Sequence, residues 1–221
     1  VVCRNGVFGG RMLENVLRCG GVPVVVEGEW GRPVDPQALE DTLRQHPDAK
    51  VVAFVHAETS TGAQSDAATL CRIASERHCL TIVDTVTSLG GTPVLVDAWG
   101  ADAVYSGSQK CLSCTPGLSP ATFSDRAIEK VKGRQGKVQS WFMDLNLVLD
   151  YWNATQRTYH HTAPGNSLYG LHEALLLLAE ESLEHAWARH RLHHAALKAG
   201  LEALGLRFVV PEAARLPQMN A

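Results

Sequence analysis

Short apolar runs recur through the first half of the chain and predict the strands of a single sheet. They lie at 1–3, 22–26, 50–56, 80–84, around Val104 and at 120–123. The run at 50–56 is almost continuously apolar, which is typical of a strand buried on both faces of a parallel sheet. Because helical stretches separate these runs, the pattern predicts βα units, an α/β fold and a mostly parallel sheet covered by helices.

Two aspartates predict where two of these helices begin. Asp35 is followed by Pro36, which suits an N-cap and a proline at the first helical position, and this helix is expected to reach about His46. Asp66 has the same N-cap role before a stretch whose apolar residues recur at helical spacing. Both helix starts are therefore predicted from local side-chain chemistry.

A glycine-rich segment near the start allows two interpretations. Asn5-Gly6 and Gly9-Gly10 are expected to form a tight turn into a first helix, which Gly20-Gly21 would end. The alternative is a phosphate-binding loop, but the segment lacks the full spacing of a dinucleotide fingerprint and the lysine of a P-loop. The turn is therefore the favoured interpretation.

The second half of the chain has a different character. Residues 167–204 are rich in Leu, Ala, Glu and His and contain no proline, which predicts one very long helix or two joined end to end. Residues 207–210 are expected to form the first strand of a small following domain. We therefore divide the chain into a large domain at 1–166, a connecting helix at 167–204 and the start of a second domain at 205–221. Both ends resemble interrupted elements, so we expect a fragment of a longer protein.

Composition narrows the possible partners and the compartment. The 221 residues are 45% apolar and carry a formal charge of −3 without long charged blocks, which argues against a nucleic-acid surface. Neither a membrane-spanning run nor a secretory signal is present in this sequence, so a cytoplasmic location is the default. The six cysteines are scattered and are expected to be reduced thiols.

The main candidate chemistry lies at the ends of two predicted strands. The strand 80–84 ends in Asp84, and the strand around Val104 leads through a Ser/Gly-rich loop to Lys110. Ligands of open parallel sheets bind at the carboxyl ends of strands, where the loop starting at Thr59 is also expected. A lysine amine and a carboxylate are what pyridoxal phosphate needs. Each residue alone is more simply a solvated lysine or a turn aspartate, so their combination carries this hypothesis.

Other patterns are weaker. Cys111 and Cys114 have the spacing of a redox or zinc half-site, but no second pair lies nearby. His160 and His161 are adjacent in an extended segment, so their side chains are expected to point to opposite sides. We therefore predict no metal site, and without a Gly-x-Ser-x-Gly motif the chain is not expected to be a serine hydrolase. The long helix also carries histidines that are expected to face solvent, at His190, His193 and His194.

Five motifs occur together in an order that resembles a known family. They are Asn5-Gly6-x-Phe8-Gly9-x-Arg11, Glu58-Thr59-Ser60-Thr61-Gly62, Asp84-Thr85-Val86-Thr87-Ser88-Leu89-Gly90-Gly91, Ser106-Gly107-Ser108-Gln109-Lys110 and Tyr159-His160-His161-Thr162. As a set they are similar to the class V aminotransferases, in particular the alanine:glyoxylate (serine:pyruvate) aminotransferase group. The resemblance covers essentially the whole chain.

The resemblance implies a fold type I pyridoxal phosphate enzyme with a mostly parallel, seven-stranded sheet and a homodimer with shared active sites. It implies that Lys110 forms the Schiff base, that Asp84 pairs with the pyridine nitrogen and that Val86 contacts the ring. It further implies cofactor contacts from Thr59 to the phenolic oxygen, from Gln109 to the phosphate, and from Tyr159 and Thr162 to the phosphate of the other subunit.

The implied reaction is ping-pong transamination of a small amino acid, alanine or serine, with glyoxylate or pyruvate as the 2-oxo acid acceptor. Other class V activities remain open, namely ureidoglycine:glyoxylate transamination or cysteine desulfuration, and so does a non-catalytic fold type I relative. In this family the phosphate cup and the substrate arginine come from segments outside Val1–Ala221, so the chain alone is expected to be inactive. Peroxisomal or mitochondrial targeting also stays open, because it would depend on the missing termini.

Overall fold

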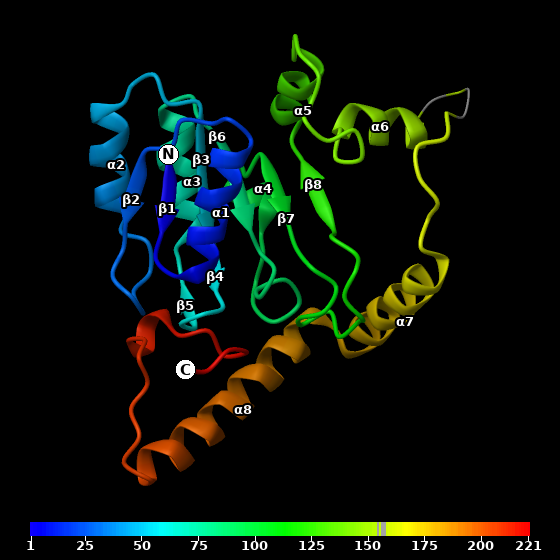
Figure 1. Ribbon diagram of the computed structural model, residues 1–221. Helices are drawn as coiled ribbons and strands as arrows, with labels where there is room; N and C mark the ends of the chain where they lie inside the picture. The colour runs from blue at the N-terminus through cyan, green and yellow to red at the C-terminus, as the bar shows by residue number, and fades with distance from the viewer. Residues whose placement is uncertain (154, 156–157) are drawn as a thin grey trace.

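Six strands form the main sheet of the computed structural model, which describes residues 1–153, 155 and 158–221 (Figure 1). The order of the strands across the sheet is β2-β1-β3-β6-β7-β8. Every pair is parallel except the last, in which β8 runs antiparallel to β7. The strands are β1 (Val2–Arg4), β2 (Val25–Glu27), β3 (Val51–Val55), β6 (Leu80–Asp84), β7 (Ala103–Tyr105) and β8 (Ala121–Phe123).

The predicted α/β fold is confirmed, with two differences of detail. The sheet described here has six strands where the resemblance implies seven. A small antiparallel hairpin that the apolar pattern did not predict, β4 (Ala57–Glu58) and β5 (Ala63–Gln64), follows β3. It forms the loop that carries Thr59.

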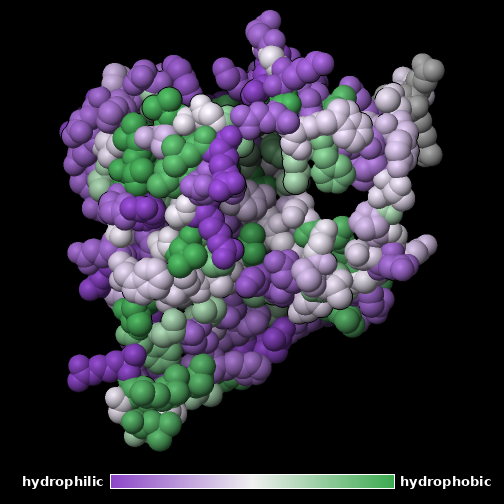
Figure 2. Space-filling view, in the orientation of Figure 1, coloured by the Kyte–Doolittle hydropathy of each residue, from purple (hydrophilic) through white to green (hydrophobic). Residues whose placement is uncertain are grey.

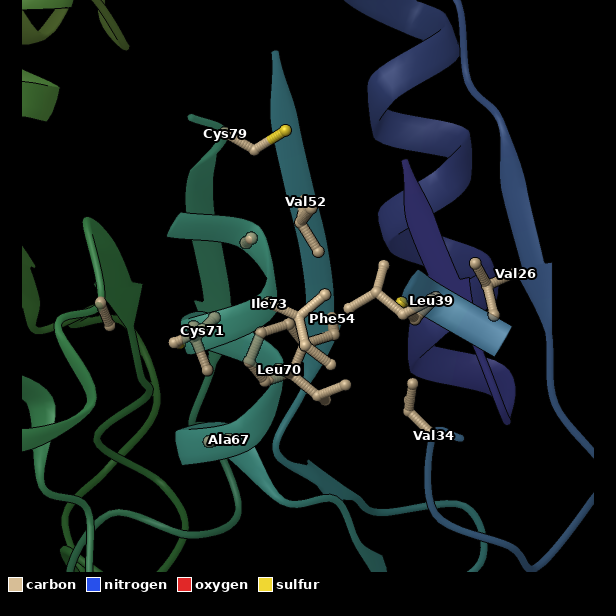
Figure 3. Close-up of a cluster of buried hydrophobic side chains, with 14 of the residues drawn as sticks. Val26, Val34, Leu39, Val52, Phe54, Ala67, Leu70, Cys71, Ile73 and Cys79 are labelled. Carbon is tan, nitrogen blue, oxygen red and sulfur yellow. The ribbon is translucent and has the colours of Figure 1, made fainter. Parts of the chain in front are cut away.

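Alternating side chains of β3 bury both faces of the sheet. Val52 and Phe54 belong to the larger hydrophobic cluster, which packs against α2 (Pro36–Gln45) and α3 (Ala67–Glu76), as Figure 3 shows. Ala53 and Val55 belong to a second cluster under α1 (Val7–Arg18). Because a strand has a period of two, one short apolar run fills both clusters. Full burial of a side chain such as Phe54 contributes about 1.5–3 kcal/mol to stability.

Both predicted aspartate caps are confirmed. The Asp35 carboxylate accepts a hydrogen bond from the Gln37 amide at 2.9 Å, and the Asp66 carboxylate accepts one from the Thr69 amide at 3.1 Å. Each cap satisfies an amide that has no partner within its own helix. The short helix α4 (Val96–Trp99) also packs beside the α3 face of the sheet.

The first helix differs from its prediction. It begins at Val7, so Gly9 and Gly10 lie inside the helix and do not form a turn before it. A Cβ atom on Gly9 would lie 3.0 Å from the Arg4 Cα and 3.1 Å from the Cys3 carbonyl oxygen. Gly9 is therefore required where the helix crosses β1 at close range, a function that the turn interpretation missed.

The second half of the chain consists mainly of helices: α5 (Asp125–Lys132), α6 (Leu145–Asn153), α7 (Gly165–Glu181) and α8 (Leu183–Ala203). The long helical segment is therefore two helices, separated at Ser182, whose φ is 67°. In Figure 1, α7 and α8 run in sequence below the sheet, and the red C-terminal segment returns beneath β5. No helix in the described part of the chain is long and apolar enough to cross a membrane.

The strand predicted at 207–210 does not form. After these residues the chain makes a short 3-10 helix, η1 (Glu212–Ala214), and Arg215 then pairs with Ala63 in an isolated antiparallel bridge. The Leu216 amide donates a hydrogen bond to the Gly62 carbonyl oxygen at 2.9 Å. The backbone of this segment therefore pairs with the β4–β5 hairpin.

Candidate functional site

Asp84 ends β6 and is held from two sides. Its side chain lies among the buried polar groups, with the residue 6% exposed. One carboxylate oxygen accepts a hydrogen bond from the Val86 amide and the other from the Tyr105 hydroxyl, both at 2.8 Å. Burial raises the pKa of Asp84 and the nearby Glu58 charge adds to the rise, while the two hydrogen bonds oppose it. The result is a fixed, largely desolvated carboxylate at the carboxyl edge of the sheet.

Tyr105 is a site residue that the sequence analysis missed. It ends β7 and stands directly opposite Asp84 in the parallel register. Burial and the adjacent Asp84 charge both raise the pKa of Tyr105, so its hydroxyl stays protonated and acts as a donor. The sequence did offer a signal: Tyr105 is the last residue of β7, and β7 lies next to the strand that ends in Asp84.

The loop between β4 and β5 places Thr59 beside the turn that follows β6. The Thr59 and Thr87 hydroxyls form a short hydrogen bond. Glu58, fully buried, accepts hydrogen bonds from the Phe8 and Gly9 amides at 3.3 and 3.1 Å and from the Ser60 hydroxyl at 2.6 Å. This carboxylate therefore anchors the Thr59 loop to the N-terminus of α1.

The same contact explains the Asn5-Gly6 motif. A Cβ atom on Gly6 would lie 2.4 Å from two carbon atoms of the Glu58 side chain. Helix N-termini attract anions, and here that anion is the chain's own Glu58 carboxylate. Glycine at this position makes room for Glu58, and this agrees with the choice against a phosphate-binding loop.

Lys110 is half-buried and lines a cavity of about 290 Å³. Thr59 and Thr87 line the same cavity, and α8 and the C-terminal segment contribute further side chains, which are Arg189, His190, Gln218 and Met219. The Gln218 amide nitrogen donates a hydrogen bond to the Thr87 carbonyl oxygen at 3.0 Å. The structure thus brings Lys110 and Thr59 together, as expected, and adds groups that the sequence analysis did not place there.

Three histidines of α8 were predicted to face solvent, and two of them are instead half-buried. His190 is half-buried in the wall of the Lys110 cavity, where burial lowers its pKa and the Arg189 charge adds to this effect. His194 is half-buried and hydrogen-bonds the Asn220 side chain at 2.5 Å. His193 is exposed, as expected. The signal that was missed is the helix break at Ser182, which sets the direction of α8.

The lining of this cavity does not include the other predicted cofactor contacts, which are Asp84, Val86, Gln109, Tyr159 and Thr162. Val86 is half-buried and holds Asp84 through its amide, whereas Gln109 is exposed and its amide group lies over Gly107. Tyr159 is 70% exposed, and its hydroxyl hydrogen-bonds the Thr162 hydroxyl at 2.6 Å. Within this chain, Tyr159 and Thr162 are thus paired with each other and not with Lys110.

No cluster of three or more metal-type ligands occurs among the described residues. Cys111 and Cys114 are unpaired thiols with different contacts, the Thr87 carbonyl oxygen and the Thr115 hydroxyl respectively. The prediction that His160 and His161 point apart is wrong, because their Nδ1 atoms lie 2.8 Å apart. The His160 ring also stacks on an aromatic side chain, Trp141.

Comparison with known proteins identifies the family. A family model described as aminotransferase class-V matches residues 14–220. Alanine–glyoxylate aminotransferase from Callithrix jacchus is 38% identical over 219 residues, which cover 98% of this chain and 53% of the relative. The chain spans about half the length of the curated relatives it matches.

Two solved structures are similar over almost the whole chain. Alanine–glyoxylate aminotransferase from Nostoc sp. is 44% identical with a TM-score of 0.93, covering 98% of this chain and 57% of that one. Ureidoglycine–glyoxylate aminotransferase from Bacillus subtilis is 36% identical with a TM-score of 0.93, covering 98% of this chain and 55% of that one. The mostly parallel sheet agrees with the fold type I architecture of these enzymes. The chain belongs to the class-V aminotransferase family.

Proposed function

We propose that the whole protein is a pyridoxal phosphate-dependent aminotransferase that moves the amino group of a small amino acid, such as alanine or serine, to glyoxylate or pyruvate. The observation that carries this proposal is the buried Asp84 carboxylate at the end of β6, with Lys110 in the loop that follows the adjacent strand β7. Relatives named alanine–glyoxylate aminotransferase support the choice of substrates.

The groups present fit pyridoxal phosphate. The cavity offers a primary amine on Lys110 and a hydroxyl on Thr59, and Asp84, three residues before the lining residue Thr87, offers a buried carboxylate. We expect Lys110, Asp84, Val86, Thr59 and Gln109 to hold the cofactor, together with Tyr159 of the partner subunit and Thr162 of the partner subunit. When bound, the cofactor supplies an aldehyde that reacts with amines and a ring that accepts electrons from the substrate α-carbon.

The Asp84 carboxylate would accept a hydrogen bond from the protonated ring nitrogen of the cofactor. Such a charge-assisted bond is roughly twice as strong as a neutral one. Val86 and Tyr105 fix the carboxylate before any ligand arrives, so little reorganisation is needed. Burial excludes water from this contact and strengthens it further.

Lys110 would act as the general base once its amine is free. We expect the amine to take a proton from the α-carbon of the substrate and to pass it to the carbon that carried the cofactor's aldehyde. Positioned proton transfer of this kind contributes about 10²–10⁴-fold to a reaction rate. Thr59, held by Thr87, would orient the cofactor from the neighbouring loop.

Ureidoglycine is the second candidate amino donor, because the Bacillus subtilis neighbour that acts on it is 36% identical and superposes equally well. A non-catalytic relative is disfavoured by the retention of both Asp84 and Lys110.

Tyr159 and Thr162 belong to the same proposal, since their pairing in an exposed segment suits a homodimer with shared sites. The unpaired thiols at all six cysteines fit a reducing compartment such as the cytosol.

The test uses the whole protein loaded with pyridoxal phosphate. Alanine, serine and ureidoglycine are each offered with glyoxylate, and alanine also with pyruvate labelled with ¹³C; the products are measured by mass spectrometry. We expect transfer from at least one donor and a loss of about 10²–10⁴-fold in Lys110→Ala. Lys132→Ala, at an exposed position on α5, is the matched control and should retain the wild-type rate. A loaded wild-type protein that transfers from none of the donors would sink the proposal.

A further inference from the structure

The cavity that contains Lys110 has a second cation in its wall. Arg189 projects into the lining from α8, and none of the described lining residues is an aspartate or glutamate. Burial raises the pKa of the Cys111 thiol in this cavity. The positive charges of Lys110 and Arg189 oppose that rise. Lys110, Cys111 and Arg189 line the same cavity, and its two cations favour an anionic ligand.

Arg189 is engaged by a carboxylate that lies outside the cavity. Its Nε and Nη2 atoms donate to the two oxygens of Glu181 at 2.5 and 2.7 Å. Glu181 is the last residue of α7, and the break at Ser182 lets it reach a residue eight positions further on. The two side chains are 45% and 31% exposed, so solvent screens this bidentate pair and a substrate carboxylate can compete with Glu181 for the guanidinium group.

The guanidinium group has capacity for another anion. Within the described residues, Nη1 of Arg189 makes no hydrogen bond or ion pair. A planar guanidinium can bind a carboxylate through two parallel hydrogen bonds, which gives both strength and orientation. The cavity volume of about 290 Å³ lies at the low end for ligand sites, which suits a small substrate.

We propose that Arg189 binds a second carboxylate of the substrate, so that dicarboxylic amino acids such as aspartate bind to this site in addition to alanine. The inference rests on the proposed function, because it places the reacting end of the substrate at Lys110. Glu181 then competes with the substrate for Arg189 and limits the affinity for dicarboxylates.

The experiment compares two ligands that cannot lose an α-proton, 2-methylalanine and 2-methylaspartate. Their dissociation constants are measured for the whole, cofactor-loaded protein from the change in its visible absorption. The quantity of interest is the preference for 2-methylaspartate over 2-methylalanine. Arg189→Gln should lower this preference by about 10-fold or more. Glu181→Gln should raise it by about twofold to fivefold, because it frees Arg189.

Arg191→Gln is the matched control, since Arg191 is exposed on the same helix and should leave the preference unchanged. An unchanged preference in Arg189→Gln, or an equal loss of affinity for both ligands, would overturn the assignment while leaving the aminotransferase proposal intact. A loaded wild-type protein that binds neither ligand and transaminates no donor would overturn both.

Discussion

The residues around Asp84 and those around Tyr159 are both expected to contact the cofactor, yet they are held in opposite ways. Asp84 is 6% exposed, and groups on neighbouring segments of this chain bond both of its oxygens. Tyr159 is 70% exposed and bonds a residue three positions away. In Figure 2, which has the orientation of Figure 1, open space separates residues 158–164, which lead into α7, from the sheet. The sheet thus pre-positions one part of the site, whereas the other part needs a second surface, which suits the proposed homodimer.

The largest effect is expected from neutralising the buried carboxylate. Asp84→Asn keeps the size of the side chain and an acceptor for the Val86 amide but removes the charge. Loss of one pre-organised electrostatic partner costs about 10²–10³-fold in rate, so transamination by the whole protein should fall by that factor. Asp97→Asn, which makes the same change at an exposed position on α4, should leave the rate unchanged. A wild-type rate in Asp84→Asn would remove Asp84 from the mechanism.

The same substitution should stabilise the cofactor-free fold. Because burial raises the pKa of Asp84, the native state holds this proton at a pH where the unfolded state has released it. Stability therefore falls as pH rises from about 3.9, the unfolded value, through the raised native pKa. The side-chain amide of the Asp84→Asn variant does not titrate, so its gain in unfolding free energy over wild type should be larger at pH 8 than at pH 4. Thermal unfolding measured at both values checks this, and an equal gain at the two would contradict it.

A smaller effect is expected where the C-terminal segment packs on the Thr59 loop. Gly62 has a φ of +83°, and a Cβ atom there would lie 3.0 Å from the Met219 carbonyl oxygen. Gly62→Ala should therefore lower the free energy of unfolding by about 2–3 kcal/mol, from left-handed strain plus crowding. Gly205→Ala separates the two causes, since Gly205 has a φ of +80° but a Cβ there would meet no described atom within 4 Å. Equal losses in denaturant unfolding would show that the packing against Met219 is unimportant.

The smallest effect is expected in the exposed segment. Tyr159→Phe removes one neutral hydroxyl that can form a hydrogen bond. The affinity of the whole protein for the cofactor should therefore fall about 2–10-fold. Tyr169→Phe is the control, because Tyr169 is 80% exposed on α7. If the partner subunit uses Tyr159, the loss should appear only at protein concentrations that support the dimer, as judged by equilibrium dialysis of the cofactor. A loss that is independent of protein concentration would contradict a shared site.

Features set by local chemistry were predictable from the sequence. The caps at Asp35 and Asp66 depend on amides two or three residues away, and the β3 run shows its burial directly. Asp84 and the Thr59 loop followed from the general position of ligands in parallel sheets. Their positions could be predicted because the strand ends determine where they lie.

Features set by distant contacts were not predictable. Glu58 accepts hydrogen bonds from the amides of residues about fifty positions earlier. No local pattern therefore indicates that it anchors the Thr59 loop. Arg189 and His190 enter the Lys110 cavity because α8 leaves Ser182 in one particular direction. The apolar run at 207–210 suggests a strand, but in the structure the Val209 amide donates a hydrogen bond to the Ala221 carbonyl oxygen at 3.2 Å, a contact that no local pattern indicates.

The most direct test of the central claim is to find the lysine that carries the cofactor. The whole protein is loaded with pyridoxal phosphate, reduced with borohydride, digested and analysed by peptide mass spectrometry. We predict that the pyridoxyl phosphate adduct lies on Lys110 and disappears in Lys110→Ala. An unmodified Lys110 in the loaded and reduced wild-type protein, or an adduct on a different lysine, would contradict the account.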